Sequence, residues 1–368
     1  MYPERITRLL SALPPANLDA VAITTGPSLV YLTGLHFHVM ERPTVALFSA
    51  HTEPALILPG LEVGKAQAGS LRVNLYPYGD DPHTWIEAFR RACADLGLNG
   101  MTIGVEPERM RFLELDFLQQ SAPDARFVPA GAVLTRLRIE KDESEITAMR
   151  KAVQVAERAF LAVLEMVKVG MSEQELASEL TVQLLRAGSA PDLPFAPIIA
   201  SGPNGANPHA FPTSRHLQAG DLVVVDWGAA VDNYFSDLTR TLAIGRIDPE
   251  WMRVAQVVAE ANAAGRAAAR PNIPAGQVDQ AARAVIDQAG YGAFFTHRTG
   301  HGLGLEEHEA PYIFSGNPEL LTPGMCFTVE PGIYLPERGG VRIEDDVVVT
   351  RDGAESLSSL PRDLFVIA

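Results

Sequence analysis

The sequence is poor in cysteine and has no long apolar stretch. Its two cysteines, Cys93 and Cys326, stand far apart and without metal-ligand spacing, which excludes a disulfide framework and favours a reducing compartment. The longest apolar runs, such as residues 43–50 and 222–227, are far shorter than the ~20 residues that span a bilayer. No basic stretch followed by an apolar core opens the chain, so no signal peptide is expected. We therefore expect a cytoplasmic protein without a membrane partner.

Basic residues are also scarce relative to acidic ones. The sequence contains 30 Lys and Arg residues and 45 Asp and Glu residues, which gives a formal net charge of −15. This charge argues against nucleic acid or an anionic membrane surface as a partner. The apolar fraction of 47% supplies a large core, and 368 residues are more than one ordinary domain contains. The composition predicts a globular protein of two domains.

Residues 1–130 are predicted to form the smaller domain, of α/β type. Short apolar runs bounded by Pro, Gly and Asn indicate strands, and the spacing of Trp85, Phe89 and Cys93 indicates a helix. Nothing in this domain looks catalytic alone, so roles in substrate gating or dimerisation are expected. Residues 131–141 are interpreted as a linker to a second domain at 142–368. The predicted strands are 20–23, 29–32, 45–48, 55–58 and 102–105, and the predicted helix is 83–96.

Two helix pairs are predicted in the second domain, each followed by strands. Asp142 with Glu145 and Ser172 with Glu175 have the spacing of capping boxes, which start helices. This order suggests two similar halves that face each other across a shared site, although no residue-level repeat is visible. The predicted helices are 142–170, 172–188, 248–269 and 278–289.

Acidic residues at the ends of predicted strands form the most informative pattern. Asp226 ends the apolar run 222–225, and Asp237 lies on the next strand, beyond a turn at residues 232–233. One hairpin therefore brings both carboxylates into the same neighbourhood. Either aspartate alone is more simply a solvated residue at a strand edge, because acidic residues are mostly exposed. Asp226, however, follows three valines, which is a costly place for an unpaired charge.

Glu330 and Glu344 repeat this arrangement around a turn at residues 336–340. Four carboxylates that converge in a strand-rich core would each cost several kcal/mol if left bare. His301, which lies between two glycines, adds a single imidazole. Two Asp, two Glu and one His form a mostly oxygen ligand set, which suits one or two hard to borderline divalent ions.

His301 also has two other interpretations. It could be a hydrogen-bonded core histidine, and the spacing of Gly300, Gly302 and Gly304 is that of some phosphate-binding loops. The phosphate loop is disfavoured because no strand-loop-helix unit and no lysine accompany these glycines. The joint pattern with four acidic residues favours the metal site.

The motifs 300–309, 328–332 and 341–345, together with Asp226 and Asp237, resemble those of the pita-bread metallopeptidases. This superfamily includes methionine aminopeptidase, aminopeptidase P and prolidase, and the resemblance covers residues 140–368. It implies an α+β fold with a C-terminal pita-bread, creatinase/methionine aminopeptidase-like catalytic domain. It further implies two divalent metal ions per subunit, Mn or Co first, with Zn or Fe as alternatives. The implied metal ligands are Asp226, Asp237, His301, Glu330 and Glu344.

The resemblance also implies roles around these ions. Glu330 moves a proton to the leaving nitrogen, His209 supports the tetrahedral intermediate, and His308 hydrogen-bonds the substrate backbone. His297 and Arg342 match further positions that contact substrate in the proline-specific branch. A structural or surface role remains the alternative for the three histidines and for Arg342. Because the nitrogen of an Xaa-Pro bond carries no hydrogen, recognition needs an apolar pocket for the proline ring. The residues expected to form it are Phe195, Ile198 and Tyr312.

The N-terminal domain resembles the extra domain of the prolidase, aminopeptidase P and creatinase branch, which methionine aminopeptidases lack. Creatinase-like members lack the metal ligands that are present here. The short domain favours prolidase, an Xaa-Pro dipeptidase, over aminopeptidase P, which acts on longer Xaa-Pro peptides. A peptidase without proline preference and a non-enzymatic binding protein of the same fold are weaker alternatives.

In this branch the protein is a homodimer, and a loop of one N-terminal domain limits substrate length at the partner's active site. The corresponding loop here is residues 35–43. Arg42, or one of His36 and His38, is expected to meet the carboxylate of a dipeptide. A polar loop or a plain dimer contact is an equal alternative.

Overall fold

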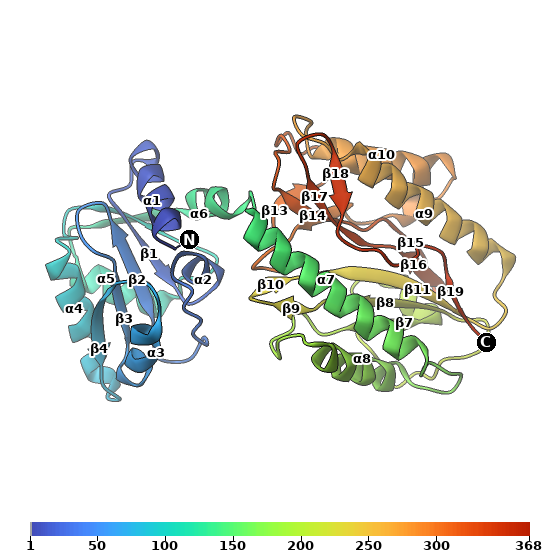
Figure 1. Ribbon diagram of the computed structural model, residues 1–368, viewed down its shortest axis with the longest axis horizontal. Coiled ribbons are helices and arrows are strands. Elements are labelled where there is room, and N and C mark those ends of the chain that lie inside the picture. Colours follow the sequence, from blue (N-terminus) through green and yellow to red (C-terminus); the bar gives the residue numbers. More distant parts are fainter. Residues whose placement is uncertain (1) are drawn as a thin grey trace. The chain divides into compact units, whose positions relative to one another are not determined.

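The structure, a computed structural model, describes residues 2–368 and divides into two compact units (Figure 1). The first unit ends at Arg138 and the second begins at Ile139. The boundary therefore falls inside the predicted linker, residues 131–141, and helix α6 (Gly131–Arg138) belongs to the first unit. The α+β class, with a smaller α/β domain before the larger one, is as predicted. No helix among residues 2–368 is both long enough and apolar enough to cross a membrane.

The first unit is built on one mixed sheet with the strand order β4-β3-β2-β1-β5-β6. Strand β2 pairs antiparallel with β1 and β3, whereas the outer pairings are parallel. Three of the four interior strands, β1, β2 and β3, are buried along their whole length, as their apolar sequences require. The strands are β1 Ala20–Thr24, β2 Val45–Ser49, β3 Ala55–Pro59, β4 Asn74–Tyr78, β5 Thr102–Val105 and β6 Arg126–Pro129. The other helices are α1 Tyr2–Ala12, α2 Pro27–Thr33, α3 Val63–Ala68, α4 Trp85–Asp95 and α5 Phe112–Ser121.

One strand prediction in this unit is wrong. Residues 29–32 belong to helix α2, not to a strand. Pro27 occupies the first helical turn, where its missing N–H costs nothing, and Gly34 ends the helix with φ 72°. The Gly34 N–H closes the helix by donating to the carbonyl of Val30 at 2.8 Å. A run of four apolar residues cannot distinguish a buried strand from a buried helix turn, whereas these flanking residues could have done so.

The second unit contains the two predicted helix pairs, α7 with α8 and α9 with α10 (Figure 1). Both capping boxes are present. The side chains of Asp142 and Ser172 accept hydrogen bonds from backbone N–H groups of the first helical turn, and the carboxylates of Glu145 and Glu175 accept from the backbone N–H groups of Asp142 and Ser172. Helix α7 ends at Leu164, six residues before the predicted end at Gly170. The chain leaves the helix there because the Gly170 N–H, at φ 86°, pairs with the carbonyl of Leu217. The helices are α7 Glu143–Leu164, α8 Glu173–Ala187, α9 Pro249–Ala268 and α10 Gly276–Gln288.

Two sheets of the second unit meet at the candidate site. One has the order β19-β11-β8-β7 and packs against α7 and α8, and the other has the order β13-β12-β14-β17-β18. A bridge between Thr239 and Glu344 joins them, with the Glu344 N–H donating to the Thr239 carbonyl at 3.1 Å. The first sheet contains β7 Ile198–Ser201, β8 Leu222–Trp227, β11 Leu238–Ile244 and β19 Phe365–Ile367. The second contains β12 Gly300–Gly302, β13 Glu309–Ile313, β14 Cys326–Val329, β17 Asp345–Val349 and β18 Ala354–Ser356.

Two short ribbons complete this unit. Strands β9 (Ala230–Val231) and β10 (Tyr234–Phe235) form the hairpin expected between the two aspartates. Its turn residues Asp232 and Asn233 have φ values of 52° and 68°, a left-handed conformation that these residue types tolerate. Strands β15 (Gly332–Leu335) and β16 (Gly339–Arg342) form the second ribbon, which packs against α9 and α10.

Candidate metal centre

Asp226 and Asp237 are placed by the antiparallel pair β8 and β11. Val225 and Trp227 of β8 pack into the core formed with α7 and α8, so the alternation of the strand turns Asp226 to the opposite face. Asp237 directly precedes β11, and its N–H donates to Oδ2 of Asp346 at 3.1 Å. Both aspartates are buried. The predicted hairpin therefore brings these two carboxylates into one buried neighbourhood.

His301 enters the site from β12, which lies between β13 and β14. A Cβ atom on Gly300 would lie 1.8 Å from the carbonyl oxygen of Thr328, and one on Gly302 would lie 2.1 Å from that of Ala310. Only glycine permits neighbouring strands to approach this closely. The flanking glycines thus set the position of the imidazole, and they do not form a phosphate-binding loop.

The acidic residues and the histidine converge. Nε2 of His301 lies 3.7 Å from Oδ2 of Asp237 and 3.5 Å from Oε1 of Glu330. One ligand-capable atom each of Asp237, His301 and Glu344 lies within 4.8 Å of the others. All five residues expected to bind metal line one cavity of about 310 Å³. The structure brings this set together from strands and strand ends that are up to 118 residues apart in sequence, Asp226 to Glu344.

Burial dominates the electrostatics of the centre. It raises the pKa of Asp226, and for Asp237 and Glu344 the neighbouring carboxylates raise the pKa further, well above the usual range. Burial likewise raises the pKa of Glu330 to about 7. Four such carboxylates can ionise together only if a cation compensates them.

Two further observations fit divalent ions at this position. Oδ1 of Asp226 is buried and has no hydrogen-bond partner among residues 2–368. Burial and the nearby His308 lower the pKa of His301 well below its usual value, which leaves its imidazole neutral, as a metal ligand must be. The donor set of carboxylate oxygens with one imidazole is the kind that binds Mn, Co, Fe or Zn.

A hydrogen-bonded chain connects Asp226 with His297. Nη2 of Arg342 donates to Oδ2 of Asp226 at 2.5 Å, and Nη1 donates to the Tyr334 hydroxyl at 3.0 Å. Burial and the charge of Arg342 lower the pKa of His297 to about 4, so the ring is neutral. Its Nδ1 lies 2.7 Å from the Arg298 carbonyl and must donate to it, so Nε2 accepts from the Tyr334 hydroxyl at 2.8 Å. Sequence analysis missed Tyr334, although it lies on β15, two residues beyond the Glu330–Gly332 motif.

A second layer of polar residues holds Glu344 and was also missed. Thr239 Oγ1 donates to Oε2 of Glu344 at 2.6 Å. The buried guanidinium of Arg240 donates to the carbonyls of Thr239 and Glu344 and to Oδ1 of Asp345. The signal in the sequence was an arginine and two aspartates within otherwise apolar strands, where a charge needs partners.

The remaining predicted substrate residues line the cavity. His209 and His308 are exposed at it, and the rings of His301 and His308 have centroids 3.9 Å apart. Phe195 and Ile198 contribute the expected apolar surface. Tyr312 does not line the cavity; its ring instead lies beneath the guanidinium of Arg298, 4.5 Å away. The notion that Tyr312 forms part of the proline pocket is therefore not supported.

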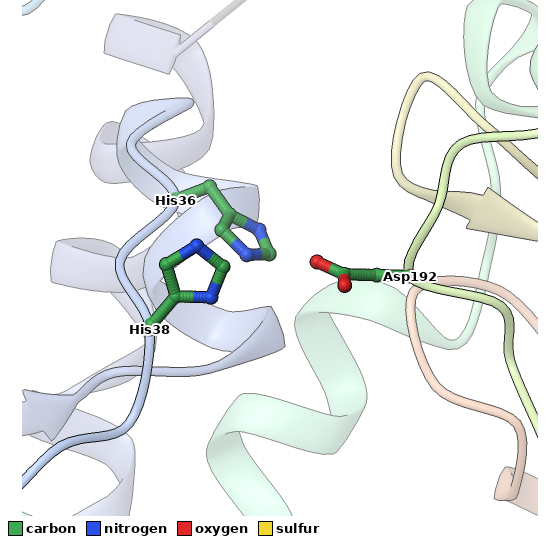
Figure 2. A group of neighbouring side chains, drawn as sticks. All are labelled: His36, His38 and Asp192. Carbon is green, nitrogen blue, oxygen red and sulfur yellow. The ribbon is translucent and has the colours of Figure 1, made fainter.

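The loop expected to gate the substrate lies in the first unit, between α2 and β2. The imidazoles of His36 and His38 meet edge to face, with ring centroids 5.5 Å apart (Figure 2). Nη2 of Arg42 lies 2.7 Å from Oδ1 of Asp80 in the same unit. The gating role of this loop stays a prediction.

Two family models match the chain. Residues 5–139 match the creatinase/prolidase N-terminal domain, and residues 147–351 match metallopeptidase family M24. The chain is 33% identical to an Xaa-Pro dipeptidase of Lactobacillus helveticus over 98% of both chains. It superposes on a dipeptidase from Pyrococcus horikoshii with a TM-score of 0.93 and 36% identity, covering 99% of this chain and 100% of the other. An X-Pro aminopeptidase from Thermotoga maritima gives a TM-score of 0.87 and 32% identity, covering 98% and 99%.

Proposed function

The chain belongs to metallopeptidase family M24, and from this membership and the cavity we propose that it hydrolyses the Xaa-Pro bond of dipeptides. It is a peptidase that acts on peptides and depends on divalent metal ions. The observation that carries the dipeptide assignment is the size of the cavity. Its volume of about 310 Å³ lies at the low end of the roughly 300–1,000 Å³ that small-molecule sites occupy. The Xaa-Pro dipeptidase and dipeptidase relatives support the same assignment.

We assign the ions to Asp226, Asp237, His301, Glu330 and Glu344, with Mn or Co first and Zn or Fe as alternatives. When bound, the ions act as Lewis acids that polarise the scissile carbonyl and lower the pKa of a water molecule. The convergence of these five side chains in one buried cavity supports the assignment.

The chain's own residues position the substrate and move the protons. Glu330 accepts a proton from the attacking water and delivers it to the leaving nitrogen. His209 stabilises the negative charge that develops on the carbonyl oxygen, and His308 holds the substrate backbone by a hydrogen bond. Both histidines line the cavity that contains Glu330.

Proline is recognised through its ring. The nitrogen of an Xaa-Pro bond carries no hydrogen, so no acceptor in the protein can select for it. Phe195 and Ile198 provide apolar surface inside the cavity, and His297 and Arg342 complete its polar wall. An ordinary dipeptide would fill this surface less well.

The proposal includes a cytoplasmic homodimer. Two free and buried thiols, Cys93 and Cys326, fit a reducing compartment. In the dimer, the loop 35–43 of one subunit limits the length of the substrate at the active site of its partner. The resemblance to the prolidase branch supports this arrangement.

Aminopeptidase P activity is the second candidate, because the Thermotoga maritima X-Pro aminopeptidase has nearly the same fold. A matched series of peptides distinguishes the candidates after Mn or Co loading: Ala-Pro, Ala-Pro-Ala, a longer Xaa-Pro peptide, Met-Ala-Ser and Ala-Ala. We expect turnover of Ala-Pro alone. Turnover of the longer Xaa-Pro peptides would identify an aminopeptidase P, and equal turnover of Ala-Ala would contradict the proline assignment.

A further inference from the structure

His209 lines the cavity, but its side chain has no anchor of its own. Its imidazole makes no hydrogen bond, ion pair or ring contact with any of residues 2–368. Its backbone N–H donates to Oδ1 of Asn207 at 3.1 Å, so the residue moves with the loop that carries it. This loop, which we call the His209 loop, comprises residues 201–213 and begins at the last residue of β7. The position of the imidazole therefore depends on what fixes the His209 loop.

A single carboxylate, that of Glu173, ties both ends of this loop. Glu173 is the first residue of α8, and its side chain is 0% exposed. Its Oε1 accepts from the N–H and from the hydroxyl of Ser201, both at 2.7 Å. Its Oε2 accepts from the N–H of Thr213 at 2.8 Å and from the hydroxyl of Thr213 at 2.6 Å. Because Ser201 and Thr213 are the two ends of the His209 loop, Glu173 closes it.

Asn204 connects the same carboxylate with the middle of the loop. Its Nδ2 donates to Oε2 of Glu173 at 2.9 Å and to the carbonyl of Phe211 at 3.1 Å. Phe211 stands two residues after His209, so this side chain holds the segment on which the imidazole lies. Five N–H and O–H donors thus converge on Glu173. Only a carboxylate can accept at both ends, because an amide would turn its own NH₂ group toward some of these donors.

Glu173 itself is remote from the reacting groups. It does not line the cavity, and its hydrogen bonds among residues 2–368 include none with the five residues assigned to the metal ions. Any effect of Glu173 on the reaction must therefore pass through the loop that it holds.

We propose that Glu173 is a positioning residue, which sets the distance of His209 from the carbonyl oxygen of the substrate. The proposal rests on the proposed function, in which His209 stabilises the charge that develops on this oxygen. Such a donor acts only at hydrogen-bond distance from the oxyanion, and a displacement of about 1 Å can cost about 100-fold in rate. The interaction strengthens in the transition state, so its loss lowers kcat more than it changes KM.

A double-mutant cycle of Glu173→Gln and His209→Ala tests this proposal with Ala-Pro and the Mn-loaded protein. Glu173→Gln alone should lower kcat by about 10- to 100-fold and leave KM within about threefold. His209→Ala alone should lower kcat by about 100- to 1,000-fold. In the His209→Ala background, Glu173→Gln should cost less than about threefold more, because the residue through which it acts is gone.

Glu175→Gln is the matched control. Glu175 lies in the same first turn of α8, but its carboxylate accepts from Ser172 inside the capping box and not from the His209 loop. This variant should keep kcat within about twofold, as surface substitutions usually do. Metal content per subunit should equal that of the parent in Glu173→Gln as well.

A milder variant keeps the test available if Glu173→Gln does not fold. Asn204→Ala removes only the side-chain link between Glu173 and the Phe211 carbonyl. It should lower kcat by about 3- to 10-fold, as expected for one or two hydrogen bonds, and the loss should again vanish in the His209→Ala background.

Two kinetic results would overturn the proposal. If Glu173→Gln costs the same factor with and without His209, its role is structural only. If metal content falls together with kcat, Glu173 acts through the metal ligands and not through His209.

If the parent cleaves none of the peptides in the matched series, the proposed function fails, and hydrogen exchange tests the positioning separately. Mass spectrometry then compares amide exchange of residues 201–213 in the parent and in Glu173→Gln. Exchange about tenfold faster in the variant, with other segments unchanged, supports the proposal. Unchanged exchange of the His209 loop refutes it.

Discussion

Asp237 is the residue at which the metal assignment can be tested most directly. Its carboxylate lies among those of Asp226, Glu330 and Glu344, and its Oδ2 approaches His301 to 3.7 Å. Asp237→Ala should reduce Ala-Pro hydrolysis to below about 1% of the parent, because loss of an outer partner of a metal ligand already costs about 10- to 100-fold. Metal content per subunit, measured on the same preparation, should fall in parallel.

Asp352→Ala is the control for this variant, because Asp352 is an exposed aspartate of the same unit. It should retain parent activity and metal content. A folded Asp237→Ala protein with normal turnover would contradict the site assignment.

At the scale of single residues, the sequence identified site residues where a charged residue stands in or beside an apolar, buried strand. Asp226 after three valines and Glu330 after a strand are charges that need a partner, and this could be seen without a structure. Tyr334 could not be identified in this way, because a tyrosine on a strand is ordinary. Its place in the site comes from hydrogen bonds, one of them with His297, a residue distant in sequence.

Among the elements, β12 is the one whose sequence is most constrained by packing. Gly300 faces the carbonyl of Thr328 so closely that an added Cβ would lie 1.8 Å from its oxygen. Gly300→Ala should force β12 away from β14 and lower the free energy of unfolding by about 1–3 kcal/mol or more. Because His301 moves with the strand, activity should fall as well. Urea unfolding, followed by circular dichroism, gives the stability change.

Gly353→Ala provides the comparison for this substitution. A Cβ at Gly353 meets no atom within 4 Å, and its φ is not positive. The variant should match the parent within about 0.5 kcal/mol, as surface substitutions usually do. Equal stability of the two alanine variants would mean that the close approach at β12 is not required.

Element boundaries were predictable where local chemistry sets them. The capping boxes at Asp142 and Ser172 and the Gly188 C-cap start or end helices through contacts within one turn, and all three are present. The end of α7 was not predictable, because Gly170 pairs with Leu217, a partner 47 residues away. The run 29–32 is predicted as a strand if only its four apolar residues are considered. The flanking Pro27 and Gly34 are the residues that indicate a helix.

For the whole molecule, the charge balance of the centre links stability to pH and to metal. Without ions, the folded-state pKa of Glu330 is raised to about 7, and those of Asp237 and Glu344 are raised well above their unfolded values. A carboxyl group of this kind holds a proton in the folded state that it releases on unfolding. The stability that it contributes is present at low pH and is lost as pH rises through the folded pKa. Bound ions replace these protons, because they require the ionised carboxylates.

Histidines of the centre limit the pH range in which this effect can be isolated. The pKa of His297 is lowered to about 4, and that of His301 lies well below 6.5, so both destabilise the fold as pH falls below the unfolded value of about 6.5. At pH 6.5 the imidazoles are about half protonated in the unfolded chain, and above about pH 7.5 they are mostly neutral in both states. Above pH 7.5 these histidines therefore contribute little to the slope, and the carboxyl groups of the centre dominate the effect of metal on it.

We therefore expect the EDTA-treated protein to lose stability from about pH 7.5 to pH 8.5, by up to about 1.4 kcal/mol per pH unit for each proton held only in the folded state. The Mn-loaded protein should show little of this loss, so the gap between the two should widen with pH. Urea unfolding of both forms at about pH 7.5, 8 and 8.5 measures this gap in unfolding free energy. If the unfolding free energies of the two forms change with pH in parallel, the buried carboxylates do not bind the metal. If the difference between them widens with pH in the parent but not in Asp237→Ala, the linkage belongs to this centre.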